Sequence, residues 1–69
     1  MNTISVPLDR LIDDAECQRL TSLSKTTRWR MARRGEFPAK VKVSAGRAAY
    51  RLSEVLAWIA SRSPRREAN

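Results

Sequence analysis

Gly35 and Pro38 divide this chain into two parts whose apolar residues recur with different periods. Before Gly35 the apolar side chains have the spacing of short helices, whereas Val41 and Val43 alternate with lysines, as residues of a strand do. Glycine adopts the left-handed conformation that stops a helix, and a proline shortly afterwards keeps the helix from continuing. The sequence therefore predicts helices before this point and a strand after it.

Two short helices are expected in the first part. Asp13 or Asp14 is the predicted N-cap of the first helix, which is followed by a turn marked by polar residues around Leu23. Ser24 is the predicted N-cap of the second helix, from about residue 25 to residue 34. Two short helices joined by a turn of three or four residues have the spacing of a helix-turn-helix.

A hairpin and a third helix are expected in the second part. A turn at residues 44–46 joins the strand around Val41 and Val43 to a returning strand at residues 48–51. Ser53 is the predicted N-cap of an amphipathic helix that ends near Arg62. The order helix, helix, hairpin, helix predicts a mainly α fold with a small β-hairpin, a winged helix-turn-helix. A hairpin is marginally stable alone in water, so it must pack on the helices.

The length of the chain allows one domain, which we assign to residues 11–62. Residues 1–10 contain a proline and show no sustained periodicity, so we expect a loose N-terminal arm there. Residues 63–69 also contain a proline, together with three charges, and a disordered basic tail is expected.

Positive charge is concentrated in the middle of the chain. The 69 residues include 14 Lys and Arg against 7 Asp and Glu, a formal net charge of +7, and residues 25–51 alone carry +8. This excess favours a polyanionic partner, either nucleic acid or an anionic membrane surface. No apolar run approaches the roughly 20 residues that span a bilayer, and no signal peptide is expected. With Cys17 as its one cysteine, the protein is expected to be cytoplasmic and associated with the nucleoid, not with a membrane.

Catalytic and metal chemistry are not expected. The chain has no His and a single Cys, so it offers neither a Ser–His or Cys–His pair nor a credible set of metal ligands. The neighbouring acids Asp13 and Asp14 would point in different directions on a helix, and a domain this small has little interior for a deep pocket. We therefore expect no enzyme activity, no cofactor and no metal.

The helix predicted from Lys25 has the residue types of a DNA-reading helix. Its N-terminal N–H groups and cations suit phosphates, arginine can pair with guanine, and threonine can contact a phosphate or a thymine methyl group. Basic residues around the hairpin could lie along a phosphate strand or enter a minor groove. The predicted DNA-binding residues are Lys25, Thr26, Thr27, Trp29, Arg30, Arg33 and Arg34 on the helix and Lys40, Lys42 and Arg47 on the wing.

Several residues have a structural alternative. Trp29 is equally well explained as a core residue or as an exposed donor to a phosphate. Arg28 falls on the side of the predicted core residues Met31 and Ala32, where its methylenes would run along the helix while its charge stays in water. The wing cations would also protect an exposed strand edge from aggregation. Three other aromatic residues are expected to pack in the core or against the hairpin: Phe37, Tyr50 and Trp58.

These segments together resemble the AlpA-type regulators of prophages and mobile elements. The resemblance is carried by residues 20–30 (LTSLSKTTRWR), 34–38 (RGEFP) and a downstream stretch from Val41 to Ile59, and it covers residues 11–62. This family is related to small phage excisionases and shares the winged helix-turn-helix of the MerR superfamily. The resemblance implies that the helix from Lys25 is the recognition helix and that the hairpin around Gly46 is the wing.

The resemblance also implies particular DNA-facing positions. By position these are Lys25, Thr26, Trp29 and Arg30 on the recognition helix and Lys42 and Arg47 on the wing. Two residues depart from the family pattern. Ser22 stands where the family usually has the turn glycine, and Arg28 stands where an apolar residue is usual.

Two roles follow from the resemblance: regulation of transcription, and recombination directionality. A directionality factor, or excisionase, bends DNA beside an attachment site so that integrase removes the element, which makes integrase a candidate partner. Because one such domain covers only a few base pairs, cooperative self-assembly on tandem sites is expected. Two other functions are kept as alternatives: an adaptor that binds a protein partner, and an RNA-binding protein. RNA binding is disfavoured because exposed aromatic residues on a sheet are missing.

Overall fold

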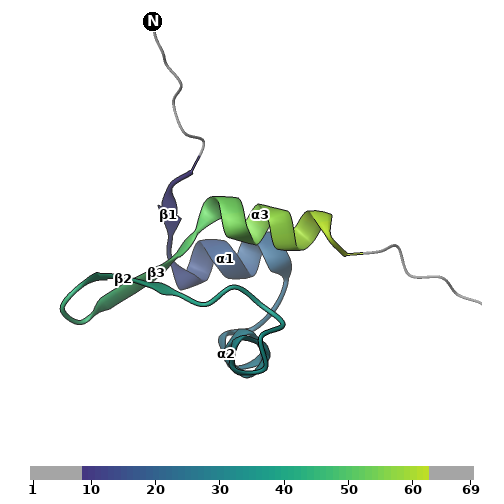
Figure 1. Ribbon diagram of the computed structural model, residues 1–69, viewed down its shortest axis with the longest axis horizontal. Helices are drawn as coiled ribbons and strands as arrows, with labels where there is room; N and C mark the ends of the chain where they lie inside the picture. The colour runs from purple at the N-terminus through teal and green to yellow at the C-terminus, as the bar shows by residue number, and fades with distance from the viewer. Residues whose placement is uncertain (1–8, 63–69) are drawn as a thin grey trace, which may run out of the picture.

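Three helices and a three-stranded antiparallel sheet make up residues 9–62, the part of the chain that the computed structural model describes (Figure 1). The elements are β1 (Leu11–Ile12), α1 (Asp14–Thr21), α2 (Lys25–Arg33), β2 (Val41–Ser44), β3 (Arg47–Arg51) and α3 (Leu52–Ala60). The predicted mainly α, winged helix-turn-helix fold is confirmed. The predicted tail at 63–69 and most of the predicted arm at 1–10 lie outside the described residues. No helix within residues 9–62 is long and apolar enough to cross a membrane.

The helix boundaries follow from local capping. The Asp13 carboxylate accepts a hydrogen bond from the Glu16 N–H at 2.9 Å, and the Ser24 hydroxyl accepts one from the Thr27 N–H at 3.2 Å. Both residues have extended backbone, as N-caps do, and so the predicted caps are confirmed. After α2, Gly35 has a φ of 74°, the left-handed conformation expected of the residue that ends this helix.

The sheet has the order β1-β3-β2 and includes one strand that the sequence did not predict. In β1, Leu11 pairs with Arg51 and Ile12 pairs with Tyr50. Two residues are too few to show an alternating pattern, so periodicity cannot reveal this strand. The predicted hairpin of β2 and β3 is confirmed, with Gly46 in its turn at a φ of 83°. Its tip projects away from the helices (Figure 1).

The predicted N-cap of the third helix is wrong. α3 begins at Leu52, directly after β3, and its N-cap Arg51 makes no capping hydrogen bond through its side chain. The Asp9 carboxylate instead accepts from the Ser53 N–H at 3.0 Å, and the Arg10 carbonyl accepts from the Leu52 N–H at 2.7 Å. The hydrogen bonds from Ser53 lower the pKa of Asp9 below its usual value. A segment 44 residues earlier in the chain thus accepts hydrogen bonds from the first N–H groups of α3.

The core is small and draws on most of the elements. The buried apolar residues are Ile12, Cys17, Phe37, Tyr50 and Val55. The Phe37 ring meets Tyr50 edge-on at 5.7 Å between centroids and meets half-buried Trp58 in the same manner at 4.9 Å. The predicted core positions of these three aromatic residues are therefore confirmed, and the Trp58 indole N–H donates to the Glu36 carbonyl at 2.9 Å.

A buried guanidinium lies beside this core. The Arg28 side chain is 0% exposed, and its terminal nitrogens donate to the Asp14 carboxylate at 2.8 Å and to the Leu23 carbonyl. The expectation that its charge would stay in water is therefore wrong, because a carboxylate of α1 and a carbonyl of the turn replace the water. The guanidinium carbon also lies 5.7 Å from the centre of the Tyr50 ring. One side chain thus links α2 to α1, the turn and β3.

The turn between α1 and α2 keeps a left-handed residue although it lacks glycine. Ser22 has φ 63° and ψ 18°, and its N–H donates to the Gln18 carbonyl at 2.7 Å. The Thr21 hydroxyl donates to the Cys17 carbonyl and accepts from the Leu23 N–H. A residue with a Cβ atom loses about 1–2 kcal/mol in this conformation. Ser22 therefore carries strain that glycine would not.

We expect Ser22→Gly to raise the free energy of unfolding by about 0.5–1 kcal/mol, because relief of this strain exceeds the extra backbone entropy that glycine loses on folding. This corresponds to a rise of several degrees in the melting temperature for a domain of this size. Thermal unfolding followed by circular dichroism measures it. Ser53→Gly, in the first turn of α3, is the matched control and should lower the melting temperature. A lower melting temperature for Ser22→Gly would contradict the strain.

Removing either partner of the buried ion pair should have unequal effects. Asp14→Ala leaves a fully buried guanidinium without its carboxylate, which should cost about 3–5 kcal/mol of the free energy of unfolding. Arg28→Met fills much of the same space and should cost less, about 1–3 kcal/mol, because the remaining Asp14 carboxylate is partly exposed and keeps Lys40 as a partner. Urea unfolding measures both variants. The asymmetry is disproved if Arg28→Met is the more destabilising.

Candidate DNA-binding surface

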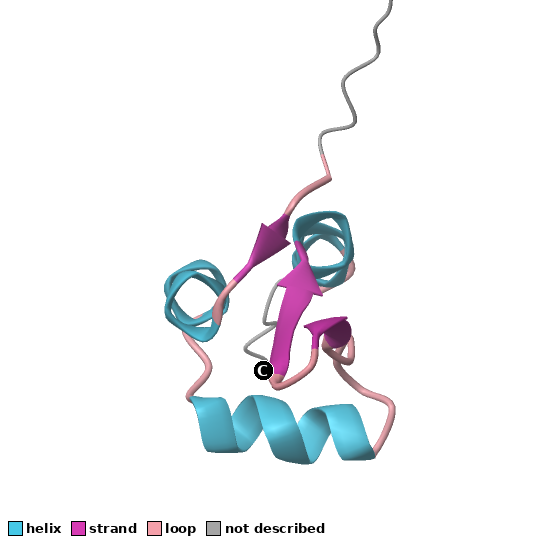
Figure 2. Cartoon of the chain, turned by 90° about the vertical axis from the view of Figure 1, so that its left-hand side faces the viewer, coloured by secondary structure: helices cyan, strands magenta, loops and turns pink. Residues whose placement is uncertain are grey.

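The outer face of α2 is basic, and its inner face packs on the core. Arg28, Met31 and Ala32 face inward, as buried or half-buried residues. The exposed residues of the helix are Lys25, Thr26, Trp29, Arg30 and Arg33. α2 lies across the direction of α1 and α3 (Figure 2). The predicted division of the helix into a core face and a solvent-facing basic face is consistent with these positions.

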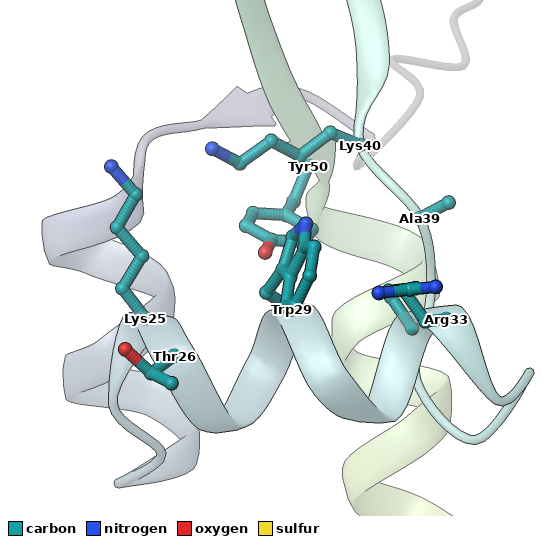
Figure 3. Close-up of a pocket in the computed structure, with 8 residues that line it drawn as sticks. Lys25, Thr26, Trp29, Arg33, Ala39, Lys40 and Tyr50 are labelled. Carbon is teal, nitrogen blue, oxygen red and sulfur yellow. The ribbon is translucent and has the colours of Figure 1, made fainter.

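A groove of about 500 Å³ runs between α2 and the base of the hairpin (Figure 3). We call it the α2–hairpin groove. The residues from α2 are Lys25, Thr26, Trp29, Ala32 and Arg33, those just before β2 are Ala39 and Lys40, and β3 contributes Tyr50. Five of the predicted DNA-binding residues therefore meet at one concave surface, although they come from two separate parts of the chain.

Trp29 stands at the centre of this surface and is 58% exposed. Of the two alternatives left by the sequence, the structure favours the exposed one. The Arg33 guanidinium carbon lies 4.8 Å from the centre of the Trp29 indole, a cation–π contact that braces both side chains on the surface of α2. The indole can therefore present an apolar face, and the guanidinium a charge, from one position.

Lys40 lies on the opposite wall of the groove, where it contacts both a carboxylate and an aromatic ring. Its ammonium donates to Asp14 at 2.8 Å and lies 5.6 Å from the centre of the Tyr50 ring. Partial burial on its own would raise the pKa of Asp14, but the hydrogen bonds from Lys40 and Arg28 outweigh it and lower that pKa below the usual 3.8. Asp14 therefore holds a full negative charge between two cations at neutral pH.

The other predicted residues of α2 lie outside the groove. Thr27 is half-buried, and its backbone N–H and its hydroxyl both contact Ser24 in the helix cap. Arg34 is exposed and pairs with Glu36 at 3.2 Å. Arg30 is exposed on the outer side of α2, where it lines another, smaller hollow together with Trp29, Arg33 and Arg34.

The hairpin cations are exposed but point along different faces of the sheet. Lys42 pairs across the hairpin with Ala48, which by strand alternation lies on the same face of β3 as Tyr50. Arg47 lines a separate hollow with Arg10, Glu16 and the exposed side chain of Val43. Neither Lys42 nor Arg47 therefore lines the α2–hairpin groove.

Sequence reasoning missed Asp14 and Tyr50 as parts of this surface. Asp14 is 26 residues from the lysine that it contacts, so no local spacing could indicate the pair. Tyr50 was correctly expected in the core, but one side of its ring also borders the groove. That a buried tyrosine lies beside an exposed tryptophan becomes clear only once the packing of β3 against α2 is known.

Two helices joined by a tight turn and followed by a basic hairpin define a winged helix-turn-helix protein. Residues 10–63 match the family model described as prophage CP4-57 regulatory protein (AlpA), and the chain belongs to this family. The resemblance seen in the sequence is thereby confirmed.

The chain is also similar to a phage protein. It is 37% identical over 54 residues to the uncharacterized protein ORF88 of Enterobacteria phage P4, a match that covers 78% of this chain. The chain matches 61% of the length of that relative. No solved structure gives a significant match.

We expect the domain to lose stability in acid because of Asp9 and Asp14. Each has a lower pKa in the folded protein than its usual 3.8, so each stabilises the fold above that pH and loses its contribution as it is protonated at lower pH. The melting temperature should therefore be level near neutral pH and fall below about pH 4. Asp9→Asn should lower the melting temperature at neutral pH and should reduce its further fall in acid. If the melting temperature of Asp9→Asn and of Asp14→Asn falls in acid as much as that of the unaltered protein, the acid sensitivity does not come from these two residues.

Proposed function

We propose that this protein binds double-stranded DNA with α2 in the major groove and the β2–β3 hairpin as a wing on the adjacent backbone or minor groove. One observation carries the proposal. Side chains of α2 and the lysine that leads into the hairpin line a single groove, with cations at Lys25, Arg33 and Lys40. A helix of about 10–12 Å diameter fits the width of the major groove, which leaves the hairpin to follow the neighbouring phosphates.

The charge distribution supports this orientation. α2 carries four basic residues and no acidic one, and three of the four basic side chains are exposed. Such cations release counterions from DNA when they neutralise phosphates, which gives affinity independent of sequence. Arg30 and Thr26 are the residues that we propose to read base edges, since arginine can pair with guanine and threonine with a thymine methyl group.

The AlpA family consists of prophage regulatory proteins, and we propose that this chain regulates genes of an integrated element. A finer proposal is that it also acts as an excisionase, bending DNA beside an attachment site together with integrase. Because one domain reads only a few base pairs, we propose that several copies assemble cooperatively on tandem sites. We expect the protein in the cytoplasm, associated with the nucleoid. None of these roles requires enzyme activity, a cofactor or a metal.

A gel shift with duplex DNA tests the proposal. The element's own promoter and attachment regions are compared with random competitor at two salt concentrations. Discrete complexes that resist competitor and multiply with protein concentration would support specific binding at several sites. Sites at promoters would favour regulation, and sites beside attachment sequences would favour excision. Uniform binding that disappears with modest salt would leave only a phosphate-contacting surface, and the adaptor would become the leading hypothesis.

Two substitutions on α2 should weaken this binding. Arg30→Ala and Lys25→Ala should each lower affinity by about tenfold or more, the usual effect of losing a base or phosphate contact. Arg30→Ala should also relax discrimination between sites, whereas Lys25→Ala should weaken all sequences alike and reduce the salt dependence. Arg19→Ala, which removes an exposed cation from α1, is the matched control and should change affinity little. The surface is wrongly assigned if both α2 variants bind like the unaltered protein.

A further inference from the structure

We infer that Asp14 and Arg28 are positioning residues that hold the Lys40 ammonium in the α2–hairpin groove, where it contacts a backbone phosphate of DNA. This inference rests on the proposed function. It adds a role for two residues that are not among the predicted DNA-binding residues. It is carried by a continuous line of charge-assisted contacts from the core to the groove.

The first contact of this line is fixed by the core. The Arg28 side chain is fully buried, so its guanidinium has one environment and one direction. It donates to Oδ1 of Asp14 at 2.8 Å, while Lys40 donates to Oδ2 of the same carboxylate at 2.8 Å. Both oxygens of Asp14 are therefore engaged, and rotation of the carboxylate would break both contacts. The rigid guanidinium orients the carboxylate, and the carboxylate orients the lysine.

Lys40 stays available to a ligand in this arrangement. Its side chain is 31% exposed, and an ammonium has three donors, of which Asp14 takes one. The ammonium also lies over the Tyr50 ring, 5.6 Å from its centre, which restricts it further. Lys40 thus presents a positive charge that is held in one position at the wall of the groove.

The chemistry of the groove fits a deoxyribose–phosphate strand. Trp29, Ala32, Ala39 and Tyr50 give it apolar walls, which suit a sugar ring. Its three cations, Lys25, Arg33 and Lys40, suit phosphates. Such a strand separates the major groove, proposed for α2, from the minor groove beside the hairpin.

Positioning and simple charge make opposite predictions for Asp14. An acidic residue next to a phosphate site should weaken DNA binding by repulsion, so its neutralisation should tighten binding. A lysine that is already held in place, however, loses less side-chain entropy when it meets a phosphate. If positioning dominates, neutralising Asp14 weakens binding although the protein becomes more positive.

The experiment uses the full chain and a mixed-sequence duplex of about 20 base pairs at low salt, because phosphate contacts do not depend on sequence. Affinity is measured by fluorescence anisotropy for Asp14→Asn, Lys40→Met, the double variant and Glu16→Gln. Glu16→Gln removes another acid of α1, one that pairs with Arg10 and Arg19 and not with Lys40, so it reports the effect of charge alone. Circular dichroism confirms that each variant is folded at the temperature of measurement.

We expect Asp14→Asn to weaken binding by about twofold to tenfold, the range expected for ordering one long side chain, while Glu16→Gln leaves binding unchanged or tighter. In the Lys40→Met background, Asp14→Asn should no longer weaken binding. Lys40→Met should lower the slope of log affinity against log salt by about one, whereas Asp14→Asn should leave this slope unchanged, because the number of phosphates contacted is the same.

Asp14→Glu keeps the charge and a partner for Arg28, so it serves if Asp14→Asn does not fold. Its longer stem displaces the carboxylate, and we expect it to weaken binding at least twofold. Tighter or equal binding by a folded Asp14→Asn, an equal loss with and without Lys40, or unchanged binding by Asp14→Glu would each overturn the positioning role. Failure of the unaltered protein to bind the duplex would overturn the proposed function itself, and this outcome is separate from the other three.

Discussion

The contact between α1 and α2 contains one buried charge, the guanidinium of Arg28. Arg28 is enclosed at the meeting point of α1, α2, the turn between them and β3, and its guanidinium is stabilised by a carboxylate and a backbone carbonyl. An apolar side chain there would fill the space without making these hydrogen bonds. A guanidinium requires its acceptors at defined angles, so it sets the orientation of α2 relative to α1. The basic face of α2 is directed outward as a result.

The apolar core beside this charge is small, so contacts between residues far apart in the sequence contribute much of the stability of the fold. Its five buried apolar residues come from β1, α1, β3, α3 and the segment between α2 and β2, and a domain of this length buries only about 60% of its unfolded surface. The segment before α1 compensates in two ways. β1 adds a strand to β3, and Asp9 supplies the hydrogen bonds at the start of α3. The wing and the last helix are consequently held by residues from the other end of the domain.

Features that depend on neighbouring residues could be predicted from the sequence. The caps Asp13 and Ser24, the helix stop at Gly35 and the strand around Val41 are all decided within a few residues, and each is confirmed. Features that depend on distant partners could not be predicted. β1 is too short to have a period, and the start of α3 is set by Asp9 and not by Ser53.

The same limit applies to the candidate site. Its cationic helix could be recognised from residue types, whereas the exposure of Trp29 depends on which face of α2 the core covers. The contact between Asp14 and Lys40 exists only because α1 lies beside the entry to the hairpin. A sequence thus indicates which side chains suit a ligand, and the packing decides which of them meet.

The two tryptophans have different surroundings, which makes them separate optical probes. Trp58 is packed against Phe37 and hydrogen-bonded to the chain, so its emission reports whether the core is intact. Trp29 faces solvent within the groove, so its emission reports what occupies that groove. With Trp58 replaced by phenylalanine, quenching of the remaining indole follows occupancy without any label. The protein therefore has an intrinsic fluorescent probe, Trp29, in the α2–hairpin groove.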